Sequence, residues 1–288
     1  MRILIGIGII LVATIGIFSM IASNIEVFLA AVPKEGAIIL GTGIGAYVIA
    51  NRAEVLRHTL QALPRVLAPP RYSKDSYLEL LSLLYTSFKL AKTKGMLALE
   101  QHVENPGESA LFQRFPRFMN DQSSLVFLCD YLRLLTLGTD NPHEVEALLD
   151  EEIETHRHEL QQVPGALQVL ADAMPALGIV AAVLGVIKTM GVIDQPANII
   201  GASIGGALVG TFLGVLLGYG FIGPMATLLK NDAEAELRYL YCMKAGILAH
   251  MQGYAPAVSV EFARKTLAAD VRPTFYEVET TVSSLPAV

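Results

Sequence analysis

The chain has 288 residues, of which 53% are hydrophobic and 17% are charged, and it contains no tryptophan. Its formal net charge of −6 does not indicate a nucleic-acid partner. The two cysteines, Cys129 and Cys242, are not part of a Cys/His cluster, which argues against a zinc site. The apolar residues form long runs instead of recurring at the intervals of a soluble core, which excludes an ordinary pair of soluble domains.

Four apolar runs come close to the ~20 residues that a helix needs to cross a bilayer. They cover Ile3–Ala22, Pro33–Ala50, Gly165–Ile187 and Ile199–Gly223. The second is the shortest, because its uncharged part covers only Gly36–Ala50, and the third carries Asp172 near its start. The first run is too long for the ~7–15-residue apolar region of a secretory signal, so we expect an uncleaved anchor. Four membrane-spanning helices are predicted.

Positive charge predicts the orientation of these spans. Residues 51–164 carry twelve Lys and Arg residues, and the tail after the fourth span carries six. The two short connections hold only Lys34 and Lys188. Since positive residues collect on the cytoplasmic side, both termini and the long loop are expected there.

Helical periodicity continues through the long loop and the tail. The helical segments are residues 76–103, 123–138, 141–160 and 231–256. Asn141 followed by Pro142 is a typical helix start, and the last dozen residues are expected to be loose. We therefore predict an all-α membrane protein with four transmembrane helices and a helical cytoplasmic domain. Its parts are residues 1–50 (spans 1 and 2), 51–164 (cytoplasmic domain), 165–224 (spans 3 and 4) and 225–288 (cytoplasmic helix and tail).

No motif indicates an enzyme, a cofactor or a metal site. His156 and His158 are two residues apart, so on a helix they point to different faces and fit a solvated helix end. The sequence GTGIGA at residues 41–46 lies in an apolar span and lacks the lysine of a phosphate-binding loop. Neither G-x-S-x-G nor H-E-x-x-H occurs.

The predicted spans lack the ionisable side chain that pumps and proton relays place at membrane depth. Asp, Glu, His, Lys and Arg are absent from 3–22, 36–50, 174–187 and 199–223. Asp172 lies close to the cytoplasmic boundary, where it fits both a bonded helix end and a role in ion exit. We therefore expect the chain to line an ion path while a second polypeptide brings the ion-binding group.

Small residues recur at every fourth position of the fourth span, where they allow close helix contact. They are Gly206, Gly210, Gly214 and Gly218, with Ala202 one turn earlier. Two interpretations remain open: packing among the spans of one subunit, and a ring of subunits closing around a central partner. The Thr211 and Ser203 hydroxyls either face an ion path or bond back to the preceding turn.

Two prolines lie at the same predicted depth, Pro175 near the start of the third span and Pro224 near the end of the fourth. Proline removes a backbone hydrogen bond and bends a helix. The pair fits either a joint between an ion site and the cytoplasmic domain or two paired helix ends.

Four motifs together resemble the MotA family of flagellar motor stator subunits. They are DAMPALGIVAAVLGVIKTMG, GGALVGTFLGVLLGYGFIGPMATLL, LLDEEIETH and GYAPAVSVEFARKTL. The resemblance implies a pentamer in the bacterial inner membrane, arranged around two copies of MotB. The single MotB span brings the aspartate that binds the ion, and ion flow turns the ring against the rotor protein FliG.

The resemblance also implies roles for individual residues. Pro175 and Pro224 match the family's functional prolines. Glu100 matches the glutamate that contacts the rotor, and Lys92, with Lys94 nearby, stands where the family has an arginine. Sodium-driven relatives have a threonine where this chain has Ala182, so proton coupling is expected, with Ala182 and Thr211 lining the path.

Two other functions remain open. One is an energy transducer similar to ExbB and TolQ, which would couple the proton gradient to an outer-membrane process, although those proteins have three spans. The other is a self-contained four-helix channel, which would have to conduct without a partner.

Overall fold

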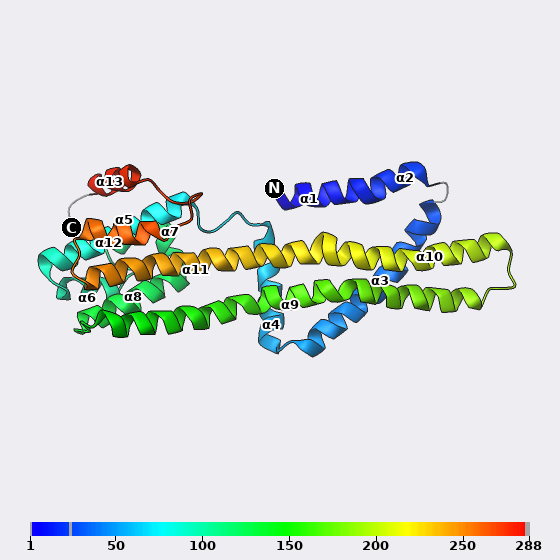
Figure 1. The fold of residues 1–288 in the computed structure, drawn as a ribbon, viewed down its shortest axis with the longest axis horizontal. Coiled ribbons are helices and arrows are strands. Elements are labelled where there is room, and N and C mark those ends of the chain that lie inside the picture. The colour runs from blue at the N-terminus through cyan, green and yellow to red at the C-terminus, as the bar shows by residue number, and fades with distance from the viewer. Residues whose placement is uncertain (1, 23–24, 286–288) are drawn as a thin grey trace. The chain divides into compact units, whose positions relative to one another are not determined.

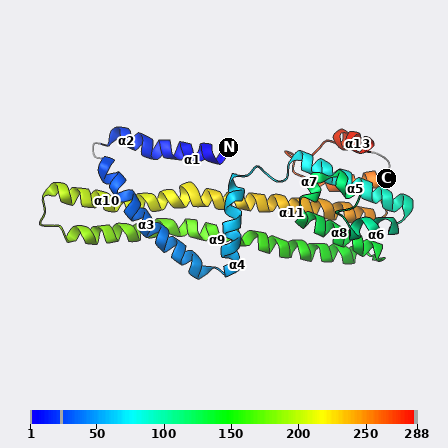
Figure 2. The same cartoon turned by 180° about the vertical axis from the view of Figure 1, so that it is seen from behind.

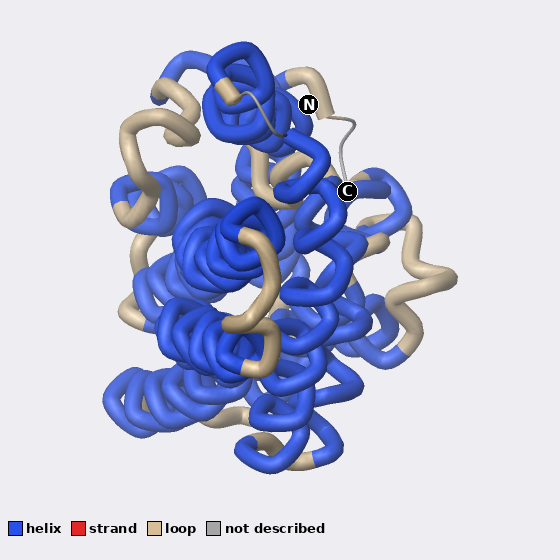
Figure 3. The backbone as a smooth tube through the Cα atoms, turned by 90° about the vertical axis from the view of Figure 1, so that its right-hand side faces the viewer, coloured by secondary structure: helices blue, strands red, loops and turns tan. Residues whose placement is uncertain are grey.

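The computed structural model describes residues 2–22 and 25–285, and within these ranges every regular element is helical (Figure 3). The chain divides into two compact units. The first comprises Met1–Pro69 and Leu160–Asn231, and the second comprises Pro70–Glu159 and Asp232–Val288. The long helices α9 (Pro142–Met190) and α11 (Gly223–Met251) contribute residues to both units (Figures 1 and 2). The prediction of an all-α protein is confirmed.

The first unit holds the apolar helices. Besides its parts of α9 and α11, it contains α1 (Arg2–Leu11), the π-helical η1 (Val12–Gly16), α2 (Ile17–Ile21), α3 (Ile25–Ala50), α4 (Ala53–Ala62), the 3₁₀-helical η2 (Leu63–Leu67), α10 (Ala197–Val215) and the π-helical η4 (Leu216–Ile222). Among the described residues, four helical stretches are long and apolar enough to cross a membrane, and the second of them is Ile25–Ala50.

Helix α3 starts earlier than the sequence predicts. It runs from Ile25 through Pro33 to Ala50 and therefore includes Glu26, Lys34 and Glu35. The short polar stretch after Pro33 looks like a connection, but the apolar residues on both sides of it continue one helix. Residues 36–50 carry no titratable group, as the sequence predicts, but the longer helix adds three charged residues before them.

Two clusters of buried side chains hold the first unit together. In one, Ile39 of α3 meets Met174 of α9 and Leu213 of α10, where Figures 1 and 2 show α3 crossing the other two helices. In the other, Val55 and Val66 pack with residues of α9 and α11. Because of this second cluster, residues 53–67 group with the apolar helices and not with the helical domain that the sequence assigns to them.

The second unit is a bundle of shorter helices. Besides its parts of α9 and α11, it contains α5 (Lys74–Lys94), α6 (Leu97–Glu104), the 3₁₀-helical η3 (Phe112–Arg114), α7 (Pro116–Met119), α8 (Gln122–Thr136), α12 (Pro256–Lys265) and α13 (Phe275–Ser283). A capping box formed by Ser73 and Ser76 starts α5, which lies against α6, α7, α12 and α13. Gly246 of α11 faces Leu84 and Phe88 of α5, so the tail helix packs on the loop helices.

Both ends of this unit are ordered by specific contacts. A capping box formed by Thr274 and Glu277 starts α13, and Lys74 Nζ lies 2.6 Å from Glu277 Oε1. The expectation of a loose tail is therefore wrong up to Leu285, because these contacts hold the helix.

Cys129 and Cys242 are free and buried, and burial raises the pKa of each thiol to about 12.

Candidate functional site

Helices α9 and α10 meet through their backbones at three glycines. A Cβ on Gly178 would lie 2.8 Å from the Gly210 carbonyl oxygen and 3.0 Å from Gly214 Cα. A Cβ on Gly214 would lie 2.7 Å from both Gly178 Cα and the Met174 carbonyl oxygen. Backbone atoms cannot move aside as a flexible side chain can, so only glycine fits at positions 178 and 214. This explains why the apolar helix carries glycines that lower its intrinsic helix propensity.

The four glycines of the fourth span do not all face the same neighbour. Gly210, Gly214 and Gly218 face α9, and Gly210 also faces Glu35 of α3. Gly206 faces Ala31 of α3, whose Cβ lies 3.7 Å from a Cβ built on the glycine. Ala202 is exposed and does not extend the contact. These contacts favour the interpretation that the stripe packs helices within one subunit.

The two prolines lie on either side of the widened π turn η4. A Cβ on Gly218, inside η4, would lie 3.3 Å from Pro175 Cδ and 2.6 Å from the Ala171 carbonyl oxygen. Pro224 is the second residue of α11, which directly follows η4. A π turn is uncommon and often marks a functional site, and proline cannot donate a backbone hydrogen bond. The structure therefore brings Pro175 to the π turn that ends two residues before Pro224.

Ala182 and Thr211 belong to the same layer of the first unit. A Cβ on Gly210, the neighbour of Thr211 in the chain, would lie 3.1 Å from the Ala182 amide nitrogen. Thr42 and Thr189 bond back to carbonyls of the preceding turn. Thr211, which is half-buried, makes no such bond within residues 25–285. Of the two interpretations of the Thr211 hydroxyl, an ion path or a bond to the preceding turn, the structure does not have the bond among its described residues.

Asp172 is exposed in the interior of α9 and does not cap a helix end. Its Oδ1 accepts a hydrogen bond from Gln168 Nε2 at 2.9 Å, one turn earlier on the same helix. The hydrogen-bond partner of Asp172 therefore lies on the same helix.

The sequence analysis missed Glu35. Its Oε2 is buried in the first unit and has no hydrogen-bond partner among the described residues. This oxygen lies 3.2 Å from the position of a Cβ on Gly210, in the layer of Ala182 and Thr211. The sequence does contain a signal that could have indicated this residue, namely a carboxylate two residues after Pro33 with apolar sequence on both sides.

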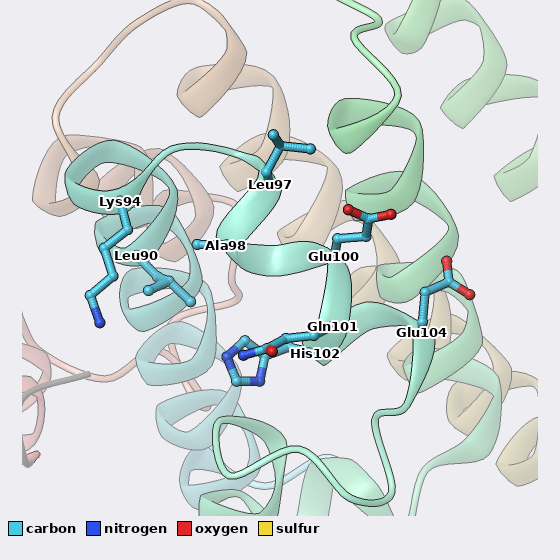
Figure 4. A pocket seen from close by; sticks show the side chains of 8 residues that line it. All are labelled: Leu90, Lys94, Leu97, Ala98, Glu100, Gln101, His102 and Glu104. Atoms are coloured by element: carbon cyan, nitrogen blue, oxygen red, sulfur yellow. The ribbon is translucent and has the colours of Figure 1, made fainter.

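Lys92, Lys94 and Glu100 surround the turn between α5 and α6. Both lysines lie in the last turn of α5, and Gly95 follows with φ of 87°, a backbone conformation that favours glycine. All three charged side chains are exposed. Lys94 and Glu100 line a depression of about 560 Å³, where their charged ends point in different directions (Figure 4), whereas Lys92 is not part of its lining.

None of these three side chains forms an ion pair within the described ranges, but a neighbouring glutamate does. Arg133 of α8 binds Glu104 of α6, with 2.6 Å between Nε and Oε1, and it also binds Asp130 at 2.6 Å. Glu104, which lines the same depression, is thus held by its own chain, while Lys94 and Glu100 remain open to a partner.

His156 lies in a charged network and not at a solvated helix end. Its Nε2 lies 3.0 Å from Glu236 Oε1, and Glu236 also lies 3.7 Å from Arg71, which binds Asp121 at 2.5 Å. The helix-end interpretation is wrong because α9 continues to Met190 and only 24% of the His156 side chain is exposed. The hydrogen bond with Glu236 raises the pKa of His156. His158 points away from this network, with 75% of its side chain exposed.

Two other features of the sequence carry no site in the structure. Residues 41–46 are part of α3, so they cannot form a phosphate-binding loop. Within the part of the chain that the structure describes, His, Cys, Asp and Glu residues form no group suited to a metal ion.

The comparisons with known proteins agree with this architecture. Residues 4–95 match the family described as Motility protein A N-terminal, and residues 120–241 match the MotA/TolQ/ExbB proton channel family. Motility protein A of Escherichia coli K12 is 45% identical over 247 residues, which are 86% of this chain and 84% of that protein. The chain belongs to the motility protein A family.

Other relatives and two solved structures extend this result. Motility protein A of Salmonella typhimurium is 44% identical over 86% of this chain and 84% of that protein. The structure of MotAB from C. jejuni matches with a TM-score of 0.72 at 18% identity, covering 90% of this chain and 91% of that one. The flagellar MotAB stator complex from Bacillus subtilis also matches with a TM-score of 0.72, at 24% identity, covering 90% and 92%. At these identities, the two structures show that the chain shares the fold of the matched chains.

Proposed function

We propose that this chain is the stator subunit of a proton-driven flagellar motor. Five copies surround two copies of a single-span MotB partner in the inner membrane, with both termini in the cytoplasm. The chain acts in transport and motility and catalyses no covalent chemistry. The family membership supports this proposal, as does the MotAB fold of the solved neighbours.

The observation that carries the proposal is the backbone contact between α9 and α10. Gly178 and Gly214 bring the helices into contact without intervening side chains, and Pro175 touches the π turn at Gly218 in the same interface. Such an interface is rigid in its middle and adaptable at the π turn. An interface of this kind fits a subunit that holds a central helix of the partner and transmits a small conformational change.

The side chain at position 182 supports proton coupling. Sodium is a hard cation that prefers oxygen ligands, and the Ala182 methyl group offers none. Cells that depend on this chain should swim at the same speed when sodium is replaced by potassium, and a protonophore should stop them. Loss of swimming on removal of sodium alone would reject proton coupling.

Contact with the rotor is assigned to the exposed charges on α5 and α6. Lys92, Lys94 and Glu100 make no ion pair among the described residues, so they can pair with opposite charges on FliG. Each exposed pair contributes about 0–1 kcal/mol, so several must act together.

The direct test is co-purification of the chain with its single-span partner, imaging of the complex, and proton flux in reconstituted vesicles. We expect five copies of this chain around two central helices, and flux only when both proteins are present. Flux through this chain alone would instead indicate a self-contained channel. Restoration of an outer-membrane uptake defect, without restoration of motility, would indicate the ExbB/TolQ-like transducer.

A further inference from the structure

Glu35 differs from the other carboxylates in the apolar helices of the first unit. Glu26 lies on the same helix but is exposed, and Asp172 accepts a hydrogen bond from Gln168. Glu35 is half-buried, and its Oε2 has neither solvent contact nor a hydrogen-bond partner among the described residues. A buried polar atom without a partner is costly, so its retention calls for a function.

The carboxylate meets α10 far from the ends of that helix. From Ala197 to Gly210 the helix rises by about 20 Å, within a hydrocarbon layer of roughly 30 Å. Oε2 of Glu35 lies 3.2 Å from the position of a Cβ on Gly210, so it stands close to the middle of the apolar stretch. Ionisable groups at this depth typically belong to an ion path.

The surroundings of Glu35 do not fix the charge of its carboxyl group. Gly210 keeps its side of the contact free of a side chain, and the nearby Ala182 and Ala181 offer only methyl groups. Lys188 of α9 is the charged group whose field reaches Glu35, but it forms no ion pair with it in the described part of the chain. The carboxyl is therefore not fixed as the permanent partner of a cation.

We propose that Glu35 is a proton-relay residue of this chain, an inference that rests on the proposed stator function. The carboxylate accepts a proton from a hydronium ion that enters from the side of the connection at residues 191–196, leaving a water molecule and a neutral carboxyl group. The neutral group then donates the same proton through water toward the ion-binding carboxylate of the partner and becomes charged again. Every transfer moves one proton and requires no other reactant.

The test compares two substitutions on one helix in the complete complex with the partner. Glu35→Gln keeps the size and polarity of the side chain but cannot release a proton, and Glu26→Gln makes the same change at the exposed position. We expect Glu35→Gln to lower proton flux in vesicles by about tenfold, less than the roughly 100-fold or more of an enzymatic general acid, because water replaces part of the relay. Glu26→Gln should leave the flux unchanged.

The outcomes separate this inference from the proposed function. If the wild-type complex conducts no protons, the stator function fails. If it conducts and Glu35→Gln conducts equally well, only the relay is overturned. Should Glu35→Gln fail to assemble, infrared difference spectra of the wild-type and Glu35→Asp complexes between acidic and alkaline buffer decide the question. A carboxyl band that differs between the two supports the relay, and identical bands overturn it.

Discussion

The imidazole Nε2 of His156 lies 3.0 Å from Oε1 of Glu236, and this contact joins the parts of α9 and α11 that belong to the second unit. These two helices also run on into the first unit, where they carry Pro175 and Pro224. The contact therefore fastens together, within the second unit, the two helices that are continuous with the apolar part of the chain.

The His156–Glu236 contact predicts that stability depends on pH. The bond raises the pKa of His156, so its stabilisation is complete below the unfolded pKa of about 6.5 and is lost as pH rises through the higher folded pKa. Thermal melts followed by circular dichroism in detergent should show less of this pH dependence in His156→Gln. The variant should also lose about 1–3 kcal/mol at low pH, because Glu236 loses a charged donor. His158→Gln, at an exposed position, is the control, and an equal loss there would contradict the assignment.

The contact between Gly178 and Gly214 predicts a large effect from a single methyl group. Gly214→Ala would place its Cβ 2.7 Å from Gly178 Cα, so the helices must separate, at a cost of about 1–3 kcal/mol. Gly201→Ala, in open space on the same helix, should instead stabilise the helix by up to about 1 kcal/mol. Melting temperatures of the purified complexes measure both effects. Equal melting temperatures for Gly214→Ala and Gly201→Ala would show that the close approach of α9 and α10 does not contribute to stability.

The position of Pro175 against η4 predicts a defect in coupling. Pro175→Ala removes the proline ring that lies next to Gly218 in η4, with its Cδ 3.3 Å from the position of a Cβ on that glycine. We therefore expect a complex that assembles but turns the motor poorly. Pro164→Ala is the matched control, since it removes another proline from the interior of α9 without altering that contact. Speeds of tethered cells, with membrane levels of each variant measured by immunoblot, check the prediction. A normal speed for Pro175→Ala would refute it.

The unpaired charges near Gly95 predict that charge reversals lower motility additively. Lys94→Glu and Glu100→Lys should each lower motility slightly, and the double variant should lower it more, because each exposed pair is worth only about 0–1 kcal/mol. A complementary charge reversal on FliG should restore part of the loss. Lys265→Glu, an exposed change on α12, serves as the control for nonspecific effects of charge. Swimming diameter in soft agar gives the comparison, and an equal defect from Lys265→Glu would argue against a specific rotor contact.

Local patterns predicted some elements well and others poorly. The helix start at Asn141 is set by neighbours in sequence, and the structure has it, with Asn141 Oδ1 accepting a hydrogen bond from the His143 amide. The start of α3 was misplaced because hydropathy treats the polar residues after Pro33 as a break, although the helix continues through them. The solvated position of His156 was wrong because its partner, Glu236, lies 80 residues away in the chain.

The sequence by itself determined the helical class, the four apolar stretches and the family, since hydropathy, periodicity and motifs are properties of consecutive residues. The tertiary structure alone decided which glycines face α9 and which faces α3, that Glu104 is paired while Glu100 is open, and that Glu35 reaches Gly210. The physical reason is that a contact between helices depends on their rotation and crossing. A difference of one residue in rotation turns a side chain by about 100° and changes what it meets, and no local pattern records that choice.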